Sequence, residues 1–509
     1  MSAPLLLDGR SLTLEAVEAV ARGTAGPLAL SPGARGKVAE SRAFIEAKVA
    51  SGERVYGVTT GFGRLAEVVI APEERTALQH NLVRSHASGV GEPLDRPAVR
   101  ALMLLRANAL ARGHSGCRPE VVERILEMLN HGIHPRVPRY GSVGASGDLA
   151  PLAHVALALL GEGRAERDGR LAPTGELLAE EGLEPFHLEA KEGLALINGT
   201  QATTALGILA LLQAERALEA VEVAGAMSLE ALLGTPEAFR TEIQEARPHA
   251  GQARSAACLR HLLRDSEIRE SHREGDPRVQ DAYALRCMPQ VHGAAREALR
   301  YVRGILETEA NSATDNPLVF PEAGVVVSGG NFHAQVVSQA LDFLAIAVAD
   351  LAAISERRIE RLLNPDLSMG LPAFLTSRPG LCSGLMIVQV TAVDCLAEMR
   401  VLAHPASVDS VTTSANQEDH VSMGLAAARK ARQAVACLEQ VVAAELLCAA
   451  QGIEFRRPLR AGAGVEEAHA RVRARVAPLD DDRELGPDLD ALVNLVREGA
   501  LARLAPTEE

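Results

Sequence analysis

Aromatic residues are scarce in this chain of 509 residues, which has no tryptophan, four tyrosines and nine phenylalanines. Intrinsic disorder and collagen-like sequence are nevertheless excluded, because hydrophobic residues make up 47% and charged residues 23%, the proportions of a globular protein. Since few large rings are available, the core has to be built mostly from Ala, Leu and Val. This composition favours closely packed helices.

Paired cysteines, basic stripes and long apolar runs are also missing. The seven cysteines are scattered and never form CxxC, which excludes a zinc ribbon and a disulfide frame and predicts reduced thiols. The net charge of −14, without a basic stripe, argues against nucleic-acid binding. No run reaches the roughly 18 apolar residues of a membrane span, and the N-terminal sequence lacks a signal-peptide pattern. We therefore expect a cytoplasmic protein that binds neither nucleic acid nor membrane.

Three long stretches with little or no Gly and no Pro stand out in the chain, at residues 200–233, 334–363 and 422–451. Each predicts a long helix; residues 334–363 alone would span roughly 45 Å at 1.5 Å per residue. Helices that are apolar over much of their surface need partners on several sides, so a bundle is expected. Short strands are expected near 68–74 and 324–332.

The residue pattern changes near Gly199, after which long Ala/Leu-rich stretches begin. Before this residue, short helical patterns alternate with Gly-rich turns. The sequence therefore predicts a mainly α protein with minor β in its N-terminal part. We expect an N-terminal domain over 1–199 and a long-helix bundle with a C-terminal helical extension over 200–509.

The most unusual segment is GSVGASGDLAPLAH at 141–154. It is neither a P-loop, because no Lys-Ser/Thr follows its last glycine, nor a nucleophile elbow, because Gly147 directly follows Ser146. One interpretation is a Gly-rich turn before a helix that Asp148 caps. The other is backbone chemistry, in which the Gly147 nitrogen attacks the Ala145 carbonyl carbon. Loss of two waters would then give an electrophilic ring with a methylene from Ser146, and the flanking glycines permit the strained turn that this closure needs.

This segment resembles the signature of the aromatic amino-acid ammonia-lyases, and the resemblance runs from YGVTTGFG at 56 to DDRELGPDL at 481. In that family Ala-Ser-Gly matures to 4-methylideneimidazol-5-one (MIO). The resemblance implies a bundle of the fumarase/aspartase-like superfamily, a homotetramer whose active sites draw on three subunits, and MIO formed autocatalytically from Ala145-Ser146-Gly147. It implies no metal or nucleotide, and the sequence has no HExxH and no Cys/His spacing of a zinc site.

Several motif residues match site positions of the family. Tyr56 matches the tyrosine that removes the substrate β-proton, and Tyr283 matches a second active-site tyrosine. Arg286 resembles the residue that binds the substrate carboxylate. This role suits arginine, because a planar guanidinium can donate two parallel N–H bonds to a carboxylate. Gln280 matches a glutamine that contacts the substrate, and Asn198 matches an amide that contacts both MIO and substrate. Phe332 matches an aromatic ring packed near MIO. Structural alternatives stay open: a turn residue for the first tyrosine, a surface ion pair for the arginine, a helix N-cap for the asparagine and core packing for the phenylalanine.

Two positions bear on the substrate. Ser85 and His86 resemble the pair of the histidine ammonia-lyase branch, where phenylalanine lyases tend to carry Phe-Leu and tyrosine lyases His-Leu. Glu418 resembles a glutamate of the same branch; facing a phenyl ring it would be a buried charge without a partner. The structural alternatives are a core or capping histidine and an exposed charge at a helix start. Together these positions favour L-histidine as substrate, with trans-urocanate and ammonia as products, the first step of histidine degradation.

Three other functions are kept as alternatives. A tyrosine ammonia-lyase or tyrosine 2,3-aminomutase would use the same MIO group with a different aryl pocket. A fumarase/aspartase-type lyase is disfavoured because its GSSxMPxKxNP loop is absent, and a catalytically silent scaffold because the motif residues are intact. Arg64, Ala282, Met288 and Thr412 depart from the family pattern, and none of them removes a group with a chemical role.

Overall fold

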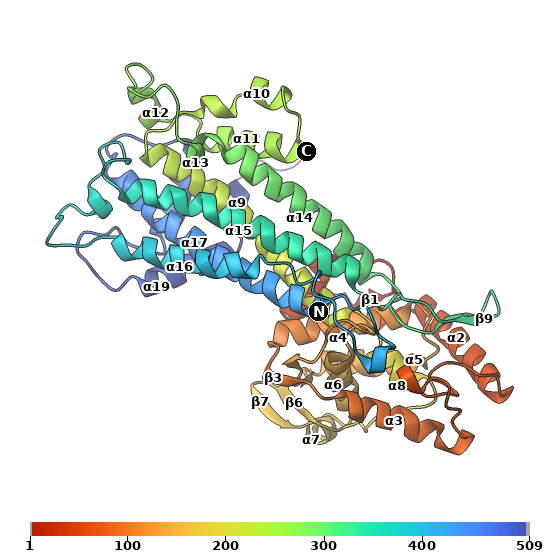
Figure 1. Cartoon of the computed structure of the whole chain (residues 1–509). Coiled ribbons are helices and arrows are strands. Elements are labelled where there is room, and N and C mark those ends of the chain that lie inside the picture. The colour runs from red at the N-terminus through yellow and green to blue at the C-terminus, as the bar shows by residue number, and fades with distance from the viewer. Residues whose placement is uncertain (1–2, 505–509) are drawn as a thin grey trace. The chain divides into compact units, whose positions relative to one another are not determined.

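The computed structural model describes residues 3–504 and is mainly helical, as predicted (Figure 1). The chain forms two compact units. Unit 1 comprises Met1–Leu209, Arg303–Asp342 and Pro405–Arg429, and unit 2 comprises Ala210–Val302, Phe343–His404 and Lys430–Glu509. The first change of unit falls after Leu209, inside a long helix, whereas the domain boundary expected between 199 and 200 stays a prediction.

Unit 1 combines short helices with small sheets. Its own helices are α1 (Leu14–Ala21), α2 (Pro32–Ala50), α3 (Arg75–His86), α4 (Arg96–Ala111), α5 (Pro119–Asn130), α6 (Leu149–Leu159), α7 (Thr174–Glu180) and α8 (Glu192–Ile197). Its strands are β1 (Leu5–Leu7), β2 (Leu28–Leu30), β3 (Val90–Pro93), β4 (His134–Pro135), β5 (Pro138–Tyr140), β6 (Arg164–Arg167), β7 (Arg170–Pro173), β8 (Leu318–Phe320) and β9 (Val325–Val327). The β1–β2 pair is parallel, and β3–β5, β4–β6–β7 and β8–β9 are antiparallel.

The two strand predictions had different outcomes. The strand expected within 324–332 is confirmed as β9, which pairs with β8. The strand expected near 68–74 is wrong, because this stretch forms only an isolated bridge between Thr60 and Val69. A 3₁₀ turn follows at once over Pro72–Glu74, where proline has no N–H to donate to a strand ladder.

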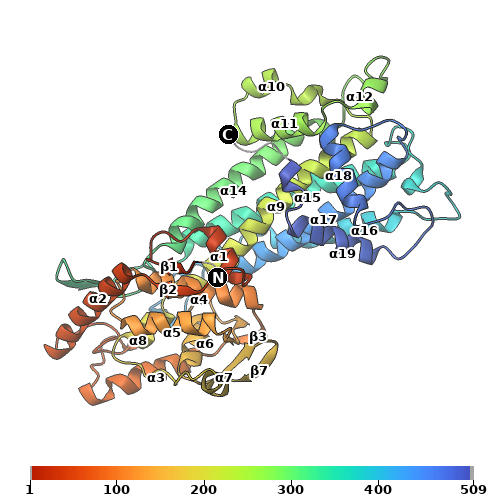
Figure 2. The same cartoon turned by 180° about the vertical axis from the view of Figure 1, so that it is seen from behind.

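Unit 2 is built around long helices. Its own helices are α10 (Thr241–Glu245), α11 (Ala250–Leu262), α12 (Glu267–Ser271), α13 (Tyr283–Arg286), α16 (Met386–Leu402), α18 (Ala463–Arg473) and α19 (Gly486–Arg497). Residues of both units belong to α9 (Gln201–Ala231), α14 (Met288–Ala310), α15 (Gln335–Leu363) and α17 (Gly424–Glu454). The three long helices predicted from the sequence are thereby confirmed as α9, α15 and α17. Figures 1 and 2 both show the unit 2 parts of these helices running alongside one another.

Small residues and one buried charge cluster join these helices within unit 2. A Cβ at Gly452 of α17 would lie 2.9 Å from that of Ala231 of α9, so the two helices are in close contact there. Glu445 of α17 accepts hydrogen bonds from Ser228 of α9 at 2.7 Å and from both Ser355 and Arg358 of α15. The cluster satisfies each buried polar group that it contains, as a buried carboxylate requires.

Within residues 3–504, two helices, α15 and α17, are long and apolar enough to cross a membrane. In their most apolar windows, however, 56% and 78% of the residues are buried inside the protein. These helices therefore pack as core helices of a folded protein do.

Candidate active site

The Gly-rich turn before α6 is fixed by contacts that only glycine allows. Gly147 has a φ of +73°, and a Cβ there would lie 2.2 Å from the carbonyl oxygen of Gly199. These two glycines form a backbone bridge, and the N–H of Asp148 donates to the same carbonyl at 2.6 Å. Gly144 has a φ of +71°, and a Cβ there would lie 2.0 Å from the hydroxyl of Ser422. The turn is therefore held on two sides by segments remote in the sequence.

Asp148 occupies the position expected of it, but its partners differ from the expectation. It precedes α6 as the N-cap residue, yet its side chain makes no cap hydrogen bond to that helix. Instead its carboxylate accepts from the N–H of Thr203, in the first turn of α9, at 2.7 Å and from Ser142 Oγ at 2.9 Å. Burial raises the pKa of Asp148, while these hydrogen bonds act in the opposite direction. The carboxylate thus ties the turn to the start of α9.

Ser146 is half-buried in this turn and contacts two other predicted site residues. Its Oγ is 3.3 Å from Oε1 of Glu418, and its carbonyl accepts from Nδ2 of Asn198 at 3.4 Å. The other oxygen of Glu418 accepts from Thr413 Oγ at 2.7 Å. Glu418 is half-buried, so the alternative of an exposed charge at a helix start is wrong.

Asn198 is the C-cap residue of α8, so the alternative that it caps the start of α9 is also wrong. The residue is 3% exposed, and its Oδ1 has no hydrogen-bond partner among residues 3–504. A buried amide oxygen without a partner is costly unless a further group contacts it. Asn198 therefore presents an unsatisfied acceptor beside Ser146.

His86 ends α3 and is half-buried. Its Nδ1 is 2.9 Å from the carbonyl oxygen of Leu82 and 3.1 Å from Ser85 Oγ. Because a carbonyl only accepts, Nδ1 carries the ring proton and Nε2 is left as an acceptor. Burial lowers the pKa of His86, while the Leu82 carbonyl and the negative charge of Glu418 raise it. His86 is thus mainly neutral near pH 7 and electrostatically linked to Glu418.

Tyr56 and Phe332 also lie in unit 1. The hydroxyl of Tyr56 accepts from the N–H of Gly63 at 3.0 Å, and its ring packs edge-to-face against Phe62 with centroids 6.3 Å apart. Phe332 is half-buried in the turn that precedes α15. In the same turn, the ring of His333 stacks on that of His420.

Unit 2 carries the other three predicted residues close together in sequence. Tyr283 and Arg286 begin and end α13, and the guanidinium lies 4.6 Å from the centre of the tyrosine ring. Tyr283 is 70% exposed, and Gln280 is exposed as well. The alternative of a surface ion pair at Arg286 is not observed within the described chain, and its buried Nε has no hydrogen-bond partner there. This arginine is thus available for another acceptor.

Arg106 was not predicted as a site residue. Its side chain is fully buried in α4 and donates to the carbonyl of Asn198 at 2.8 Å, to Gln201 Oε1 at 2.9 Å and to the carbonyl of Ala195. It therefore fixes the segment that faces Ser146. A single arginine inside the apolar run ALMLLRANALA was the signal available in the sequence.

No group of three or more His, Cys, Asp or Glu residues that could hold a metal ion occurs in the described part of the chain. The functional groups near the Gly-rich turn of unit 1 are instead a hydroxyl, a carboxylate, a neutral imidazole and an unsatisfied amide, which belong to Ser146, Glu418, His86 and Asn198. The predicted absence of a metal stays a prediction.

Known proteins resemble this chain over nearly its whole length. A histidine ammonia-lyase from Anaeromyxobacter sp. (strain K) is 56% identical over 506 residues, 98% of this chain and 99% of that protein. The structure of histidine ammonia-lyase from Trypanosoma cruzi matches with a TM-score of 0.92 at 45% identity, covering 99% of this chain and 95% of that one. The tyrosine aminomutase of Streptomyces globisporus matches with a TM-score of 0.93 at 39% identity, covering 99% and 98%. The family model for aromatic amino acid lyases matches residues 12–474, and the chain therefore belongs to the aromatic amino acid lyase family.

Proposed function

We propose that this protein is a histidine ammonia-lyase, which converts L-histidine to trans-urocanate and ammonia. The observation that carries the proposal is the carboxylate of Glu418, 3.3 Å from Ser146 Oγ and close enough to His86 to influence its charge. A carboxylate and a neutral imidazole suit a substrate ring that has N–H groups, and they do not suit a phenyl ring. The names of the relatives from Anaeromyxobacter and Trypanosoma cruzi support the same substrate.

We propose that MIO forms from Ala145-Ser146-Gly147, and the surrounding residues fit such a group. The left-handed glycines at 144 and 147 give the turn a conformation that other residues rarely adopt. Nδ2 of Asn198 donates to the Ser146 carbonyl, the oxygen that such a ring would keep, and its buried Oδ1 is left to accept from a donor such as the substrate amine. When present, MIO supplies an electrophile that no ordinary side chain provides and so makes the substrate amine a better leaving group.

The side chains around this turn have separate proposed tasks. Nε2 of His86 and the carboxylate of Glu418 are both acceptors, so together they bind the substrate ring in its protonated imidazolium form, in which each nitrogen carries an N–H. Tyr56, whose hydroxyl is fixed by Gly63, removes the β-proton. Phe332 is proposed to pack near MIO, and Ser85 to hold the His86 ring in place.

Gln280, Tyr283 and Arg286 are proposed to complete the active site from other subunits of a homotetramer. The guanidinium of Arg286 would bind the substrate carboxylate through two parallel N–H donors. Assembly is supported by four exposed apolar residues on one face of α16 (Ile387, Val390, Val393 and Val401), each at least 43% exposed. Light scattering is expected to give four copies per particle, and a stable, active monomer would contradict this arrangement. We also propose a cytoplasmic location, which the seven free cysteines support.

The substrate assignment is tested with the purified protein and L-histidine, L-tyrosine and L-phenylalanine, followed by ultraviolet absorbance. We expect urocanate from histidine and no product from the other two. Coumarate or β-tyrosine would instead indicate a tyrosine ammonia-lyase or aminomutase. The mass of the intact chain should be lower by two waters, and a full encoded mass without activity would indicate a silent scaffold. Ser146→Ala should keep the full mass and lose nearly all activity.

Glu418→Gln tests the ring-binding role, and Asp419→Asn is its matched control because it removes one charge from an exposed neighbour. Losing a hydrogen bond to a charged group weakens an interaction by about ten- to hundredfold, so kcat/KM for L-histidine should fall by that factor in Glu418→Gln alone. Equal activity in the two variants would exclude Glu418 from substrate binding.

A further inference from the structure

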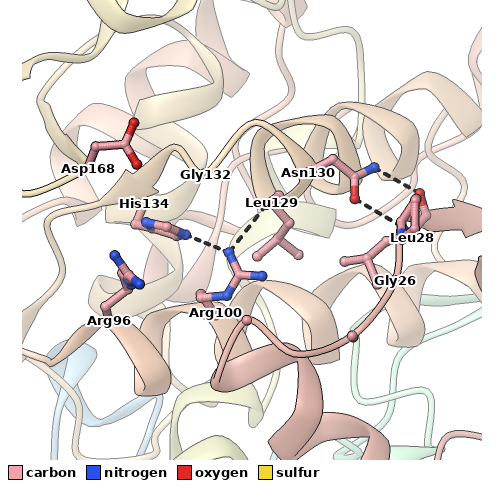
Figure 3. Close-up of a pocket in the computed structure, with 12 residues that line it drawn as sticks. Gly26, Leu28, Arg96, Arg100, Leu129, Asn130, Gly132, His134 and Asp168 are labelled. Carbon is pink, nitrogen blue, oxygen red and sulfur yellow. Dashed lines mark hydrogen bonds between the residues drawn. The ribbon is translucent and has the colours of Figure 1, made fainter. Parts of the chain in front are cut away.

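A cavity of about 420 Å³ lies in unit 1 and shares no residue with the cluster around Ser146. Its wall is formed by the loop from Gly23 to Leu28, the first two turns of α4, the end of α5 with Gly132, His134 of β4 and Asp168. Figure 3 shows the side chains of Arg96 and Arg100 directed from α4 toward His134. The proposed lyase chemistry assigns no task to any of these groups.

The two arginines bring positive charge to the cavity without a matching carboxylate. Arg100 donates to the carbonyl of Val20 at 2.7 Å, to that of Leu129 at 3.3 Å and to Nε2 of His134 at 2.7 Å, and all three acceptors are neutral. Among residues 3–504, the side chain of Arg96 makes no hydrogen bond or ion pair, and the side chain of Arg100 makes no ion pair with a carboxylate. Burial and the charge of Arg96 lower the pKa of Arg100. Arginine nevertheless keeps its proton, so the two like charges remain close together.

His134 adds a buried polar group that faces the same space. It is 5% exposed, and because its Nε2 accepts from Arg100, the ring proton is on Nδ1. Nδ1 has no hydrogen-bond partner in the described chain, although Oε2 of Glu166 lies 3.5 Å away. Burial and the charges of Arg100 and Arg96 lower the pKa of His134 to about 4, against the effect of Glu166. His134 is therefore neutral near pH 7 and does not offset the arginine charges.

The acidic side chain on the cavity wall does not neutralise the arginines. Asp168 has a side chain that is 89% exposed, and its Oδ2 lies 3.7 Å from Nε of Arg167, outside the cavity. These two guanidinium groups suit an anion with several oxygens. Arg96 can donate two parallel N–H bonds, whereas Arg100 can donate only through Nη2, because its Nε and Nη1 already donate to Val20, Leu129 and His134. Their combined charge matches a dianion, and a phosphate monoester carries about −1.5 to −2 at pH 7. The cavity is also larger than a phosphate ion needs.

We propose that the cavity bordered by Arg96, Arg100 and His134 binds the phosphate group of a small organic phosphate. The phosphate oxygens accept from Arg96 and from the Nη2 edge of Arg100. The organic part lies against the loop from Gly23 to Leu28. The site is independent of the Ser146 turn, so it would exist whichever amino acid the enzyme deaminates.

Calorimetric titration of the full-length protein tests this site, with glycerol 3-phosphate and inorganic phosphate as probes and thermal unfolding as a second measurement. The monoester should bind about tenfold more tightly than inorganic phosphate or better, because only the monoester contacts the loop. Arg96→Gln should weaken both by about tenfold or more, through the loss of a hydrogen bond to a charged group. Arg10→Gln, at an exposed arginine outside the cavity, is the matched control and should bind like the wild type.

Arg100→Gln should lose binding as well, but this arginine also holds three internal acceptors, so a folding defect would explain the same result. Arg96 makes no such contacts, and its variant alone decides the question. Arg96→Gln that binds the monoester like the wild type would overturn the proposal. So would equal binding of the monoester and inorganic phosphate, or a wild-type protein that binds neither.

Discussion

Replacing Gly147 by alanine tests whether the contact between the Ser146 turn and Gly199 creates the reactive site. The new Cβ would lie 2.2 Å from the carbonyl oxygen of Gly199 and 2.5 Å from its carbonyl carbon, so one backbone segment has to move by about 1 Å or more. That shift breaks the 2.6 Å hydrogen bond from Asp148 to Gly199, which costs about 1–3 kcal/mol in a buried setting. A left-handed φ adds about 1–2 kcal/mol for alanine, giving a total loss of roughly 2–5 kcal/mol in the free energy of unfolding.

Gly52→Ala is a matched control for the same strain. Gly52 also has a φ of +73°, but a Cβ there would meet no atom within 4 Å, so only the cost of about 1–2 kcal/mol remains. Urea unfolding gives the two stabilities, the intact mass reports the loss of two waters, and urocanate absorbance gives the rate. We expect Gly147→Ala to keep the full encoded mass and to lose about a hundredfold or more in rate, because displacement by 1 Å disrupts reacting geometry. Equal stability, mass and rate in the two variants would refute the reasoning.

Three further changes probe buried groups. Arg106→Met removes the donors that hold Asn198, and it should cost roughly 3 kcal/mol in urea unfolding and lower kcat in the folded protein; an unchanged kcat would show that this anchoring is dispensable. Burial raises the pKa of Glu230 to about 7 from 4.5, so its stabilising contribution is complete below pH 4.5 and is lost as pH rises through about 7. Between pH 5 and pH 8 the wild type should therefore lose about 2.5 kcal/mol relative to Glu230→Gln in urea titrations, and parallel pH curves would contradict this. Arg358→Met leaves Glu445 as a buried charge without its partner and should lower the free energy of unfolding in urea by about 3–5 kcal/mol. The neighbouring variant Arg357→Met serves as the comparison, and a smaller loss of stability in Arg358→Met than in Arg357→Met would be inconsistent with a buried pair.

The long helices were predictable because their sequences are nearly free of Gly and Pro, and α9, α15 and α17 appear where this pattern lies. The helix α14 was missed because Pro289, Gly293 and Gly304 interrupt the same pattern. At Gly293 the reason is tertiary: a Cβ there would lie 2.5 Å from the backbone of Gln252, so glycine is needed for packing despite its low helix propensity. Local propensity contains no information about such a contact.

In the candidate site, too, the sequence motifs predicted individual residues, whereas contacts between segments remote in the sequence could not be predicted. Motifs predicted which residue types matter, and the structure brings Ser146, Asn198 and Glu418 together within unit 1. The partners of Asp148 could not be predicted, because a local pattern indicates the helix that follows directly, whereas its carboxylate binds Thr203. Arg106 was missed for a related reason: its acceptors, on Ala195, Asn198 and Gln201, lie about ninety residues further along the chain.

Backbone strain is concentrated beside Glu418. Eleven residues other than glycine have a positive φ in the described chain, and four of them fall between 414 and 423: Ser414, Ala415, Asn416 and Met423. Each costs about 1–3 kcal/mol and persists only where surrounding contacts determine it. Here those contacts run to the Ser146 turn, since Met423 donates to the carbonyl of Val143 at 2.8 Å and Thr413 pairs with Glu418 through backbone and side chain. The strain is thus offset by the contacts that hold the carboxylate against Ser146, which is the arrangement expected if this segment is shaped by catalysis and not by stability.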